Sequence, residues 1–360
     1  MLKKTIRRLG ALAMVLAMAV SVFAVNASAA DATDTAITEG SFEKKVSVPS
    51  DVYGPATQYT FTLATATAGE NEKVESVPVS DGKVGGIYFS KNANDEKVYT
   101  YTTTTFSATS KGDQTETINY KLDASVFPKP GIYKYTLTET DPQYDGMTAD
   151  TTVRYLYVYV RNATAGTGYE VYGVKAFIVT TKADGTTETT KVDGDFDNKY
   201  DKTNQLIIKK ELVGAMADEN QEFKFEVTIT AASGNETEQY VAVRKNVNRG
   251  TEVTTEYTIV SGKKFTFYLK GDETLTITGL SANDTYTVTE DTPNDYKATW
   301  TGTHEDGKID VSKGTTVTCT NTKESVSPTG VIMTIAPYAL MVVLAGAFAV
   351  VFLSRRNRAE

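Results

Sequence analysis

Two lysines lie in stretches of alternating polar and apolar residues that predict β-strands. Lys44 has the same parity as Phe42, Val46 and Val48. Lys210 shares its face with three apolar side chains, those of Leu206, Ile208 and Leu212. Because successive side chains of a strand point to opposite faces, both lysines should point into a hydrophobic core. Burial disfavours the ammonium form and favours the neutral amine, which is a nucleophile.

An asparagine side-chain amide is an electrophile that such an amine could attack if another group polarised its carbonyl and transferred protons. A buried glutamate can stay protonated and serve both purposes. The product is a Lys–Asn isopeptide bond, and ammonia is released. Each half of the chain contains such a set in the same order, with Glu139 and Glu290 in the role of promoting bond formation. We predict two sets: Lys44, Glu139 and Asn198; and Lys210, Glu290 and Asn321.

Each of these residues also has a simpler interpretation. Lys44 and Lys210 each have a second lysine beside them, and lysines on strand edges are commonly solvated. Glu139 and Glu290 could be turn acids that follow a strand. The recurrence of the ordered lysine, glutamate and asparagine in both halves favours the bond-forming interpretation.

The elements that would position these residues are short strands. Runs of Thr, Val, Tyr and Phe at period two occur throughout the middle of the chain and are typical of half-buried strands. They include TQYTFTLAT, GIYKYTLTE, TTVRYLYVYV, NQLIIKKELV, FKFEVTITA and TTVTCTN. Turn signals such as KPG, ADG and EDGK separate them, as in β-sandwiches. We therefore predict an all-β fold with a domain boundary in the polar stretch near residue 202, giving domains at 31–202 and 203–323.

The two ends of the chain differ from this pattern. Residues 1–29 combine four basic residues, an apolar stretch and the sequence Ala27-Ser28-Ala29, which together predict a secretory signal peptide. Residues 331–353 carry no charge and would span roughly 35 Å as a helix, enough to cross a membrane. Three arginines follow this segment.

Composition excludes several function classes. The formal net charge is −8, and without the signal peptide and everything after Thr329 it becomes −14, so we predict neither nucleic acid nor anionic lipid as a partner. The single cysteine, Cys319, excludes an internal disulfide and is expected to be a small core residue. The single histidine, His304, argues against a histidine-rich metal site or a hydrolase triad. We predict no cofactor and no metal.

The motifs resemble a known family, the two-domain major pilins of Gram-positive bacteria. The resemblance covers nearly the whole chain and rests on FEKKV, YTLTE, FDNKYD, LIIKKELVG, YTVTE and CTNTKES followed by VSPTG. It implies tandem immunoglobulin-like (CnaB-type) β-sandwich domains. It also implies that the two lysine, glutamate and asparagine sets form intramolecular isopeptide bonds.

The resemblance further implies that residues 324–360 are a sortase sorting signal. Its pentapeptide would be Val326, Ser327, Pro328, Thr329 and Gly330, with cleavage after Thr329 and transfer of the Thr329 acyl group to an amine. The pentapeptide departs from the commoner Leu-Pro-x-Thr-Gly. The acceptor in such a polymer is a lysine ahead of the last strand of the first domain, and Lys191, in a Thr-rich loop, is the leading candidate. Lys182 is the alternative.

The sequence thus predicts a non-enzymatic subunit of a covalently polymerised pilus at the Gram-positive cell surface. Its partners would be sortase, identical subunits, peptidoglycan and further minor or tip pilins, with the membrane involved only before sortase processing. The main alternative is an adhesin that is anchored singly to the cell wall and binds a host protein or glycan. An enzyme is a third and more distant alternative.

Overall fold

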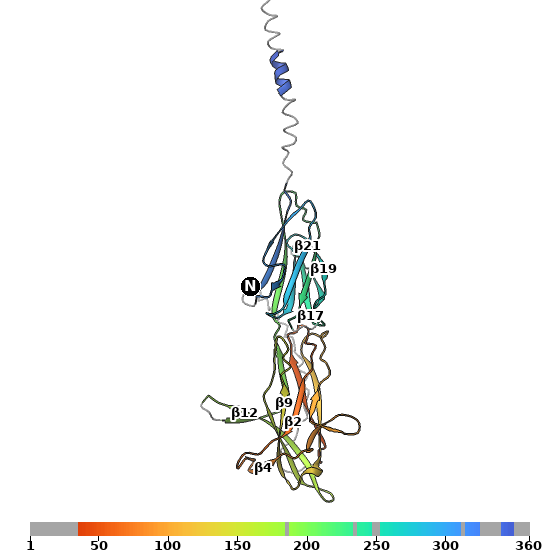
Figure 1. Cartoon of the computed structure of the whole chain (residues 1–360), viewed down its shortest axis with the longest axis vertical. Coiled ribbons are helices and arrows are strands. Elements are labelled where there is room, and N and C mark those ends of the chain that lie inside the picture. The colour runs from red at the N-terminus through yellow and green to blue at the C-terminus, as the bar shows by residue number, and fades with distance from the viewer. Residues whose placement is uncertain are drawn as a thin grey trace, which may run out of the picture.

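The structure is a computed structural model that describes residues 35–183, 187–232, 236–246, 253–310, 314–324 and 340–348. Within these residues the chain forms two β-sandwich units stacked end to end along the long axis (Figure 1). The first is built from residues before 201 and the second from residues after 203. The predicted all-β fold is confirmed.

The first unit contains two sheets. The six-stranded sheet has the order β10 (Met147–Thr148), β14 (Phe196–Tyr200), β1 (Glu39–Ser47), β8 (Gln114–Leu122), β5 (Ile87–Ser90) and β6 (Lys97–Val98). The eight-stranded sheet has the order β13 (Thr187–Val192), β12 (Tyr169–Thr181), β11 (Arg154–Asn162), β9 (Gly131–Thr140), β2 (Thr60–Thr65) and β7 (Thr100–Thr102), with β4 (Val77–Asp81) on β9 and β3 (Lys73–Val74) on β4. A short 3-10 helix, η1 (Ala124–Val126), precedes β9.

The second unit also contains two sheets. The six-stranded sheet has the order β18 (Val253–Val260), β17 (Gln239–Asn246), β20 (Thr274–Leu280), β15 (Asn204–Val213), β24 (Thr315–Thr322) and β22 (Lys297–Thr301). The four-stranded sheet has the order β19 (Phe265–Leu269), β16 (Phe223–Thr230), β21 (Thr285–Asp291) and β23 (Gly307–Lys308). The EDGK stretch, which the sequence suggested as a turn, therefore contributes the short strand β23.

In both units the first and last strands lie side by side and run parallel. β1 pairs with β14, and β15 pairs with β24. Parallel neighbours cannot be joined by a tight hairpin, so each pair brings together segments from opposite ends of its unit. This arrangement places the N-terminal lysine of each predicted set beside the C-terminal asparagine.

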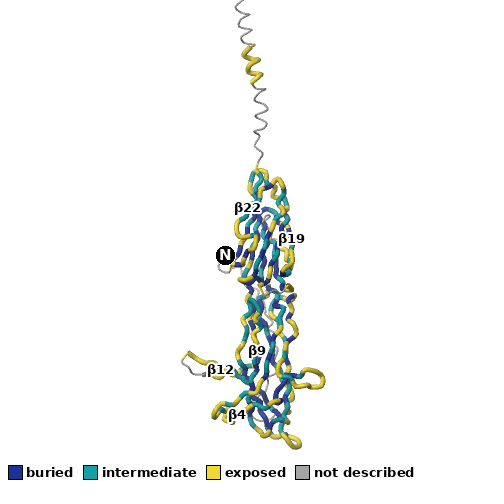
Figure 2. The backbone as a smooth tube through the Cα atoms, in the orientation of Figure 1, coloured by how far each residue is buried: buried dark blue, intermediate teal, exposed yellow. Residues whose placement is uncertain are grey.

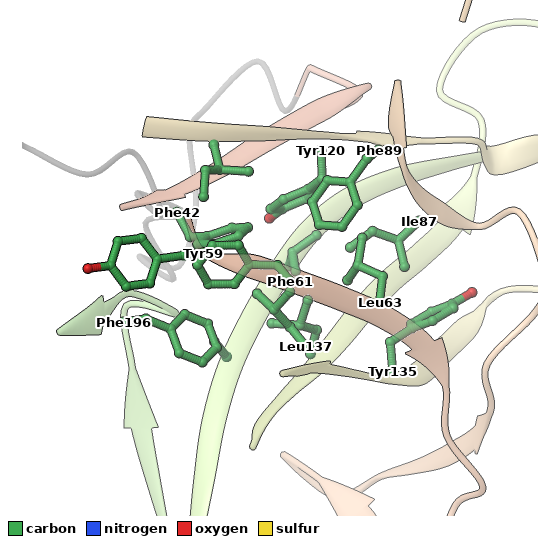
Figure 3. Packing of buried hydrophobic residues seen from close by; sticks show 14 of the residues in the cluster. Phe42, Tyr59, Phe61, Leu63, Ile87, Phe89, Tyr120, Tyr135, Leu137 and Phe196 are labelled. Carbon is green, nitrogen blue, oxygen red and sulfur yellow. The ribbon is translucent and has the colours of Figure 1, made fainter. Parts of the chain in front are cut away.

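The cores form between the sheets from side chains of alternate positions. Along β1, Phe42, Lys44 and Val46 are buried while their neighbours are partly exposed. The core of the first unit is strongly aromatic, with the ring of Phe61 lying 5.1 Å from Phe42 and 5.2 Å from Phe196 (Figure 3). Buried residues follow the axis of both units, and exposed residues gather on projecting loops and hairpins (Figure 2). The inward-pointing lysines thus belong to continuous buried cores.

The predicted targeting segments lie mainly outside the described residues. The signal peptide at 1–29 and the sorting pentapeptide at 326–330 fall wholly outside them. Of the predicted membrane span at 331–353, residues 340–348 are described, and they are helical. Among the described residues, no helix has both the length and the apolar character needed to cross a membrane.

Candidate functional site

The first candidate site lies between the two sheets of the N-terminal unit. Lys44 on β1 and Asn198 on the adjacent β14 belong to the same sheet, and Glu139 on β9 faces them from the opposite sheet. The prediction that Lys44 points inward is confirmed, because it is fully buried. Asn198 is also fully buried, and Glu139 is 4% exposed.

Glu139 contacts both other residues of this set. Lys44 Nζ donates to Glu139 Oε2 at 2.8 Å, and Asn198 Nδ2 donates to Glu139 Oε1 at 2.5 Å. The carbonyl of the Asn198 amide accepts the backbone N–H of Asp150 at 2.7 Å. The Lys44 ammonium also lies 4.6 Å from the centre of the Tyr59 ring. The three predicted residues are therefore in direct contact through the carboxyl group.

The electrostatics of this site favour neutral partners. Burial lowers the pKa of Lys44 below its ordinary value, and the nearby Glu139 carboxylate only partly opposes this effect. Burial likewise raises the pKa of Glu139, against the opposing effects of Lys44 and of the Asn198 hydrogen bond. Both directions favour transfer of a proton from lysine to glutamate, which produces an amine and a carboxylic acid.

The second candidate site has the same construction in the C-terminal unit. Lys210 on β15 and Asn321 on β24 are fully buried in one sheet, and Glu290 on β21 faces them from the other. Asn321 Nδ2 donates to Glu290 Oε1 at 2.6 Å, while Lys210 Nζ lies 3.4 Å from Glu290 Oε2. The Lys210 ammonium lies 4.3 Å from the centre of the Phe223 ring. The inward orientation of Lys210 is confirmed.

A cysteine distinguishes the second site from the first. Cys319 is fully buried next to Asn321 on β24, and its thiol contacts Glu290 Oε2 at 2.5 Å. Its sulfur lies 3.7 Å from Lys210 Nζ. Burial and the hydrogen bond to Glu290 raise the pKa of the Cys319 thiol, and burial lowers the pKa of Lys210. The thiol shares a carboxylate oxygen with the lysine, a contact that sequence parity alone could not reveal.

The strand register is identical at the two sites. Asn198 lies opposite Val46, two residues after Lys44. Asn321 lies opposite Leu212, two residues after Lys210. In a strand, a residue two positions along points to the same face. The lysine and asparagine therefore project into the core side by side, in both units, with a glutamate across from them.

The two candidate acceptor lysines lie on a hairpin that projects from the N-terminal unit (Figure 1). Lys191 is exposed and lies on β13, opposite Phe177 of β12. The expectation of a Thr-rich loop at this lysine was wrong, because β13 extends the sheet at its edge. Lys182 is exposed near the end of β12 and lies 3.2 Å from Glu188. Thr329, the predicted acyl donor, is outside the described residues.

Comparison with solved structures identifies the fold. The crystal structure of the major pilin from Streptococcus pyogenes matches 81% of this chain and 100% of its own, with a TM-score of 0.56 and 21% identity. A second S. pyogenes major pilin, T3.2, matches 80% of this chain and 99% of its own, with a TM-score of 0.54 and 21% identity. The fold is therefore that of the β-sandwich major pilins.

Sequence comparison then gives the family. A pilin from S. pyogenes serotype M1 is 30% identical over 265 residues, which cover 68% of this chain and 74% of the relative. The pilus tip adhesin Cpa from S. pyogenes is 34% identical over 132 residues, covering 36% of this chain and 18% of Cpa. Residues 204–323 also match the family described as Domain of unknown function (DUF7601). The chain belongs to the streptococcal pilin family and is a structural pilus subunit.

Proposed function

We propose that this pilin is the shaft subunit of a covalently polymerised pilus and that each β-sandwich closes itself with a Lys–Asn isopeptide bond. The observation that carries the proposal is the repeated site, in which a buried lysine, glutamate and asparagine meet in the same register in both units. Chance burial of two lysines would not explain this repetition, because an inward-facing lysine is costly. The domains would be those expected at residues 31–202 and 203–323.

The proposed reaction follows from the contacts in the first unit. Lys44 transfers a proton to Glu139, and the resulting amine attacks Cγ of Asn198. The Asp150 N–H, 2.7 Å from Asn198 Oδ1, stabilises negative charge that develops on that oxygen. Glu139 then delivers protons to Nδ2, which it already contacts, and ammonia leaves. Lys210, Glu290 and Asn321 have the same roles in the second unit.

Intact mass spectrometry tests the internal bonds. The mature protein should weigh less than its sequence by two ammonia molecules, and tryptic digests should contain branched peptides that join Lys44 to Asn198 and Lys210 to Asn321. Glu139→Ala and Glu290→Ala should each restore one ammonia. As a matched control, Glu226→Ala removes a partly exposed strand glutamate that pairs with Lys264, and it should leave both losses intact. An unshifted mass in folded wild-type protein would refute the internal bonds.

We also propose that sortase joins the subunits by linking Thr329 of one to Lys191 of the next. Lys191 supports this assignment because it is exposed on an edge strand of a projecting hairpin, where another protein can reach it. Sortase and peptidoglycan would be the processing partners, and further pilins would complete the pilus.

The native host provides the test of polymerisation. Cell-wall extracts should show a ladder of large species that survives boiling in detergent, with peptides joining Thr329 to Lys191. Lys191→Arg should collapse the ladder, because arginine keeps the charge but is too basic to act as the nucleophile. The control Lys182→Arg should leave it intact. A ladder that persists in Lys191→Arg would move the acceptor elsewhere, and monomeric wild-type protein on peptidoglycan would indicate a singly anchored adhesin.

A further inference from the structure

A third fully buried lysine lies at the junction of the two units. Lys202 follows β14 and precedes β15, so it belongs to the segment that links the sandwiches. Its Nζ donates to Glu238 Oε1 and lies 3.4 Å from Asp284 Oδ2. Glu238 and Asp284 are themselves buried and belong to the second unit. The linking segment thus inserts a lysine among carboxylates of the following domain.

The surrounding residues hold Lys202 in place. Gly146 has a φ of +76°, and a Cβ at that position would lie only 2.9 Å from Cγ of Lys202. The rings of Tyr200 and Tyr240 lie 5.9 and 5.8 Å from the Lys202 ammonium. A glycine in a left-handed conformation and two aromatic rings therefore shape a compartment for this side chain.

This junction has the same composition as the two Lys–Glu–Asn sites, except that an aspartate replaces the asparagine. In all three places a fully buried lysine contacts a glutamate and lies over an aromatic ring. At the junction, Glu238 contacts the lysine as the glutamates do at the other two sites, and Asp284, which Lys202 also contacts, offers the side-chain carbonyl. An aspartic acid can form the same amide as an asparagine, with water leaving in place of ammonia.

Asp284 is fixed with its two oxygens in different environments. Oδ1 accepts the Ala232 N–H and the Ser281 hydroxyl, each at 3.0 Å. Oδ2 faces Lys202 and also accepts the Ser281 N–H at 2.9 Å. The two donors on Oδ1 would stabilise that oxygen as the carbonyl carbon is attacked, and they would remain as partners of the amide product.

We propose that Lys202 and Asp284 form a third isopeptide bond, which joins the two sandwich units, and that Glu238 carries the protons. Nζ of Lys202 bonds to Cγ of Asp284, and the bond from Cγ to Oδ2 breaks. The two protons that the ammonium loses pass through Glu238 to Oδ2, which leaves as water, so no other reactant is needed. A hollow lined by Tyr144, Asp145 and Ala232 adjoins the junction and provides a route for the water.

Such a bond would change how the subunit transmits load. Without it, the side-chain contacts across this junction are noncovalent, among them the ion pair of Lys202 and the hydrogen bond from Asn283 to Asp145, and they separate when the domains are pulled apart. With it, the turn before β21 is covalently tied to the linking segment. The proposal uses the chemistry of the proposed function at a separate site, so either can fail alone.

The test is the intact mass of the wild-type mature protein together with peptide mapping. The expected loss is one water in addition to two ammonia molecules, with a branched tryptic peptide that joins Lys202 to Asp284. Trypsin should not cleave after Lys202, because its amine is acylated. Lys202→Met, Asp284→Ala and the nearly isosteric Glu238→Gln should each abolish the water loss and retain both ammonia losses.

The protein contains a matched internal control. Lys323 contacts Asp295 at 2.5 Å and lies 4.9 Å from the Tyr296 ring, but Lys323 is partly exposed and Asp295 is exposed. This pair should give no branched peptide, and Lys323→Arg should retain all three mass losses.

The outcomes separate this proposal from the internal Lys–Asn bonds. Two ammonia losses without the water loss would overturn the junction bond and leave the proposed function standing. The water loss without the ammonia losses would overturn the internal Lys–Asn bonds and leave the junction bond standing. A water loss with no Lys202–Asp284 peptide would also overturn the proposal, because succinimide formation at an aspartate releases water too. A branch to Asp145 or Glu238 would overturn the assignment of Asp284.

Discussion

Loss of the bond between Lys210 and Asn321 should destabilise the C-terminal sandwich by an amount that follows from the length of the closed loop. The bond would close a loop of roughly 110 residues, for which the chain-entropy model gives about 5 kcal/mol at 25 °C. For a domain of this size, that corresponds to a fall in Tm of about 15–20 °C. Asn321→Ala removes the bond while keeping the buried contact between Lys210 and Glu290.

A double-mutant cycle isolates the contribution of the bond. Lys210→Met and Asn321→Ala each prevent bond formation, so the second substitution should cost little once the first is present. The coupling free energy should be about 5 kcal/mol, compared with 0.5–3 kcal/mol for ordinary neighbouring residues. The other local costs of the substitutions, such as lost packing, largely cancel in the cycle.

The fluorescence of the single tryptophan reports on unfolding of the C-terminal unit, which carries the bond under test. Trp300 lies on β22 opposite Cys319, beside the strand that carries Asn321, and it stacks on His304 at 4.1 Å. Its fluorescence during equilibrium urea unfolding therefore follows the C-terminal sandwich alone. Intact mass must show both ammonia losses in the wild type, and only the loss from the N-terminal unit in each variant. A coupling of 3 kcal/mol or less in samples with these masses would refute the entropic reasoning.

Three further predictions concern pH, the cysteine and the core. In Asn198→Ala the Lys44 amine stays free, and because burial lowers its pKa, the unfolded chain binds more protons between the folded pKa and the ordinary value of 10.5. The free energy of unfolding should therefore rise with pH through that window relative to Asn198→Ala/Lys44→Met, and equal profiles would contradict this. Cys319, buried and with a raised pKa, should resist alkylation by iodoacetamide until the domain unfolds; rapid labelling of the native protein would show that the thiol is accessible. Phe61→Ala should cost about 3–5 kcal/mol in urea unfolding, because Phe61 is fully buried, and a cost below about 1 kcal/mol would mean that the core collapses around the gap.

The inward lysines show how much the sequence could predict. Period-two alternation places Lys44 with Phe42 and Val46, and the structure buries all three. The same argument succeeded for Lys210. Alternation is a local property of the strand, so it predicts which side chains are buried without knowledge of the fold. It also predicted the all-β class and most of the longer strands.

Other features could not be predicted from local patterns. Whether Glu139 and Glu290 are turn acids or core residues depends on the opposite sheet, and the structure places both side chains against a buried lysine. The β13 strand around Lys191 forms only because β12 pairs with it. The local sequence around Lys202 did not predict its burial, because the residues that enclose its side chain come from both units.

Sequence by itself therefore determined the strand faces, the order of lysine, glutamate and asparagine in each half, and the resemblance to pilins. Only the tertiary structure decided which residues meet. The parallel pairing of first and last strands sets the register that puts Asn198 beside Lys44, and the packing of the second sheet brings Glu139 onto both. The physical reason is that alternation depends on adjacent residues, whereas contacts across 95 or 59 positions depend on sheet pairing and sandwich packing.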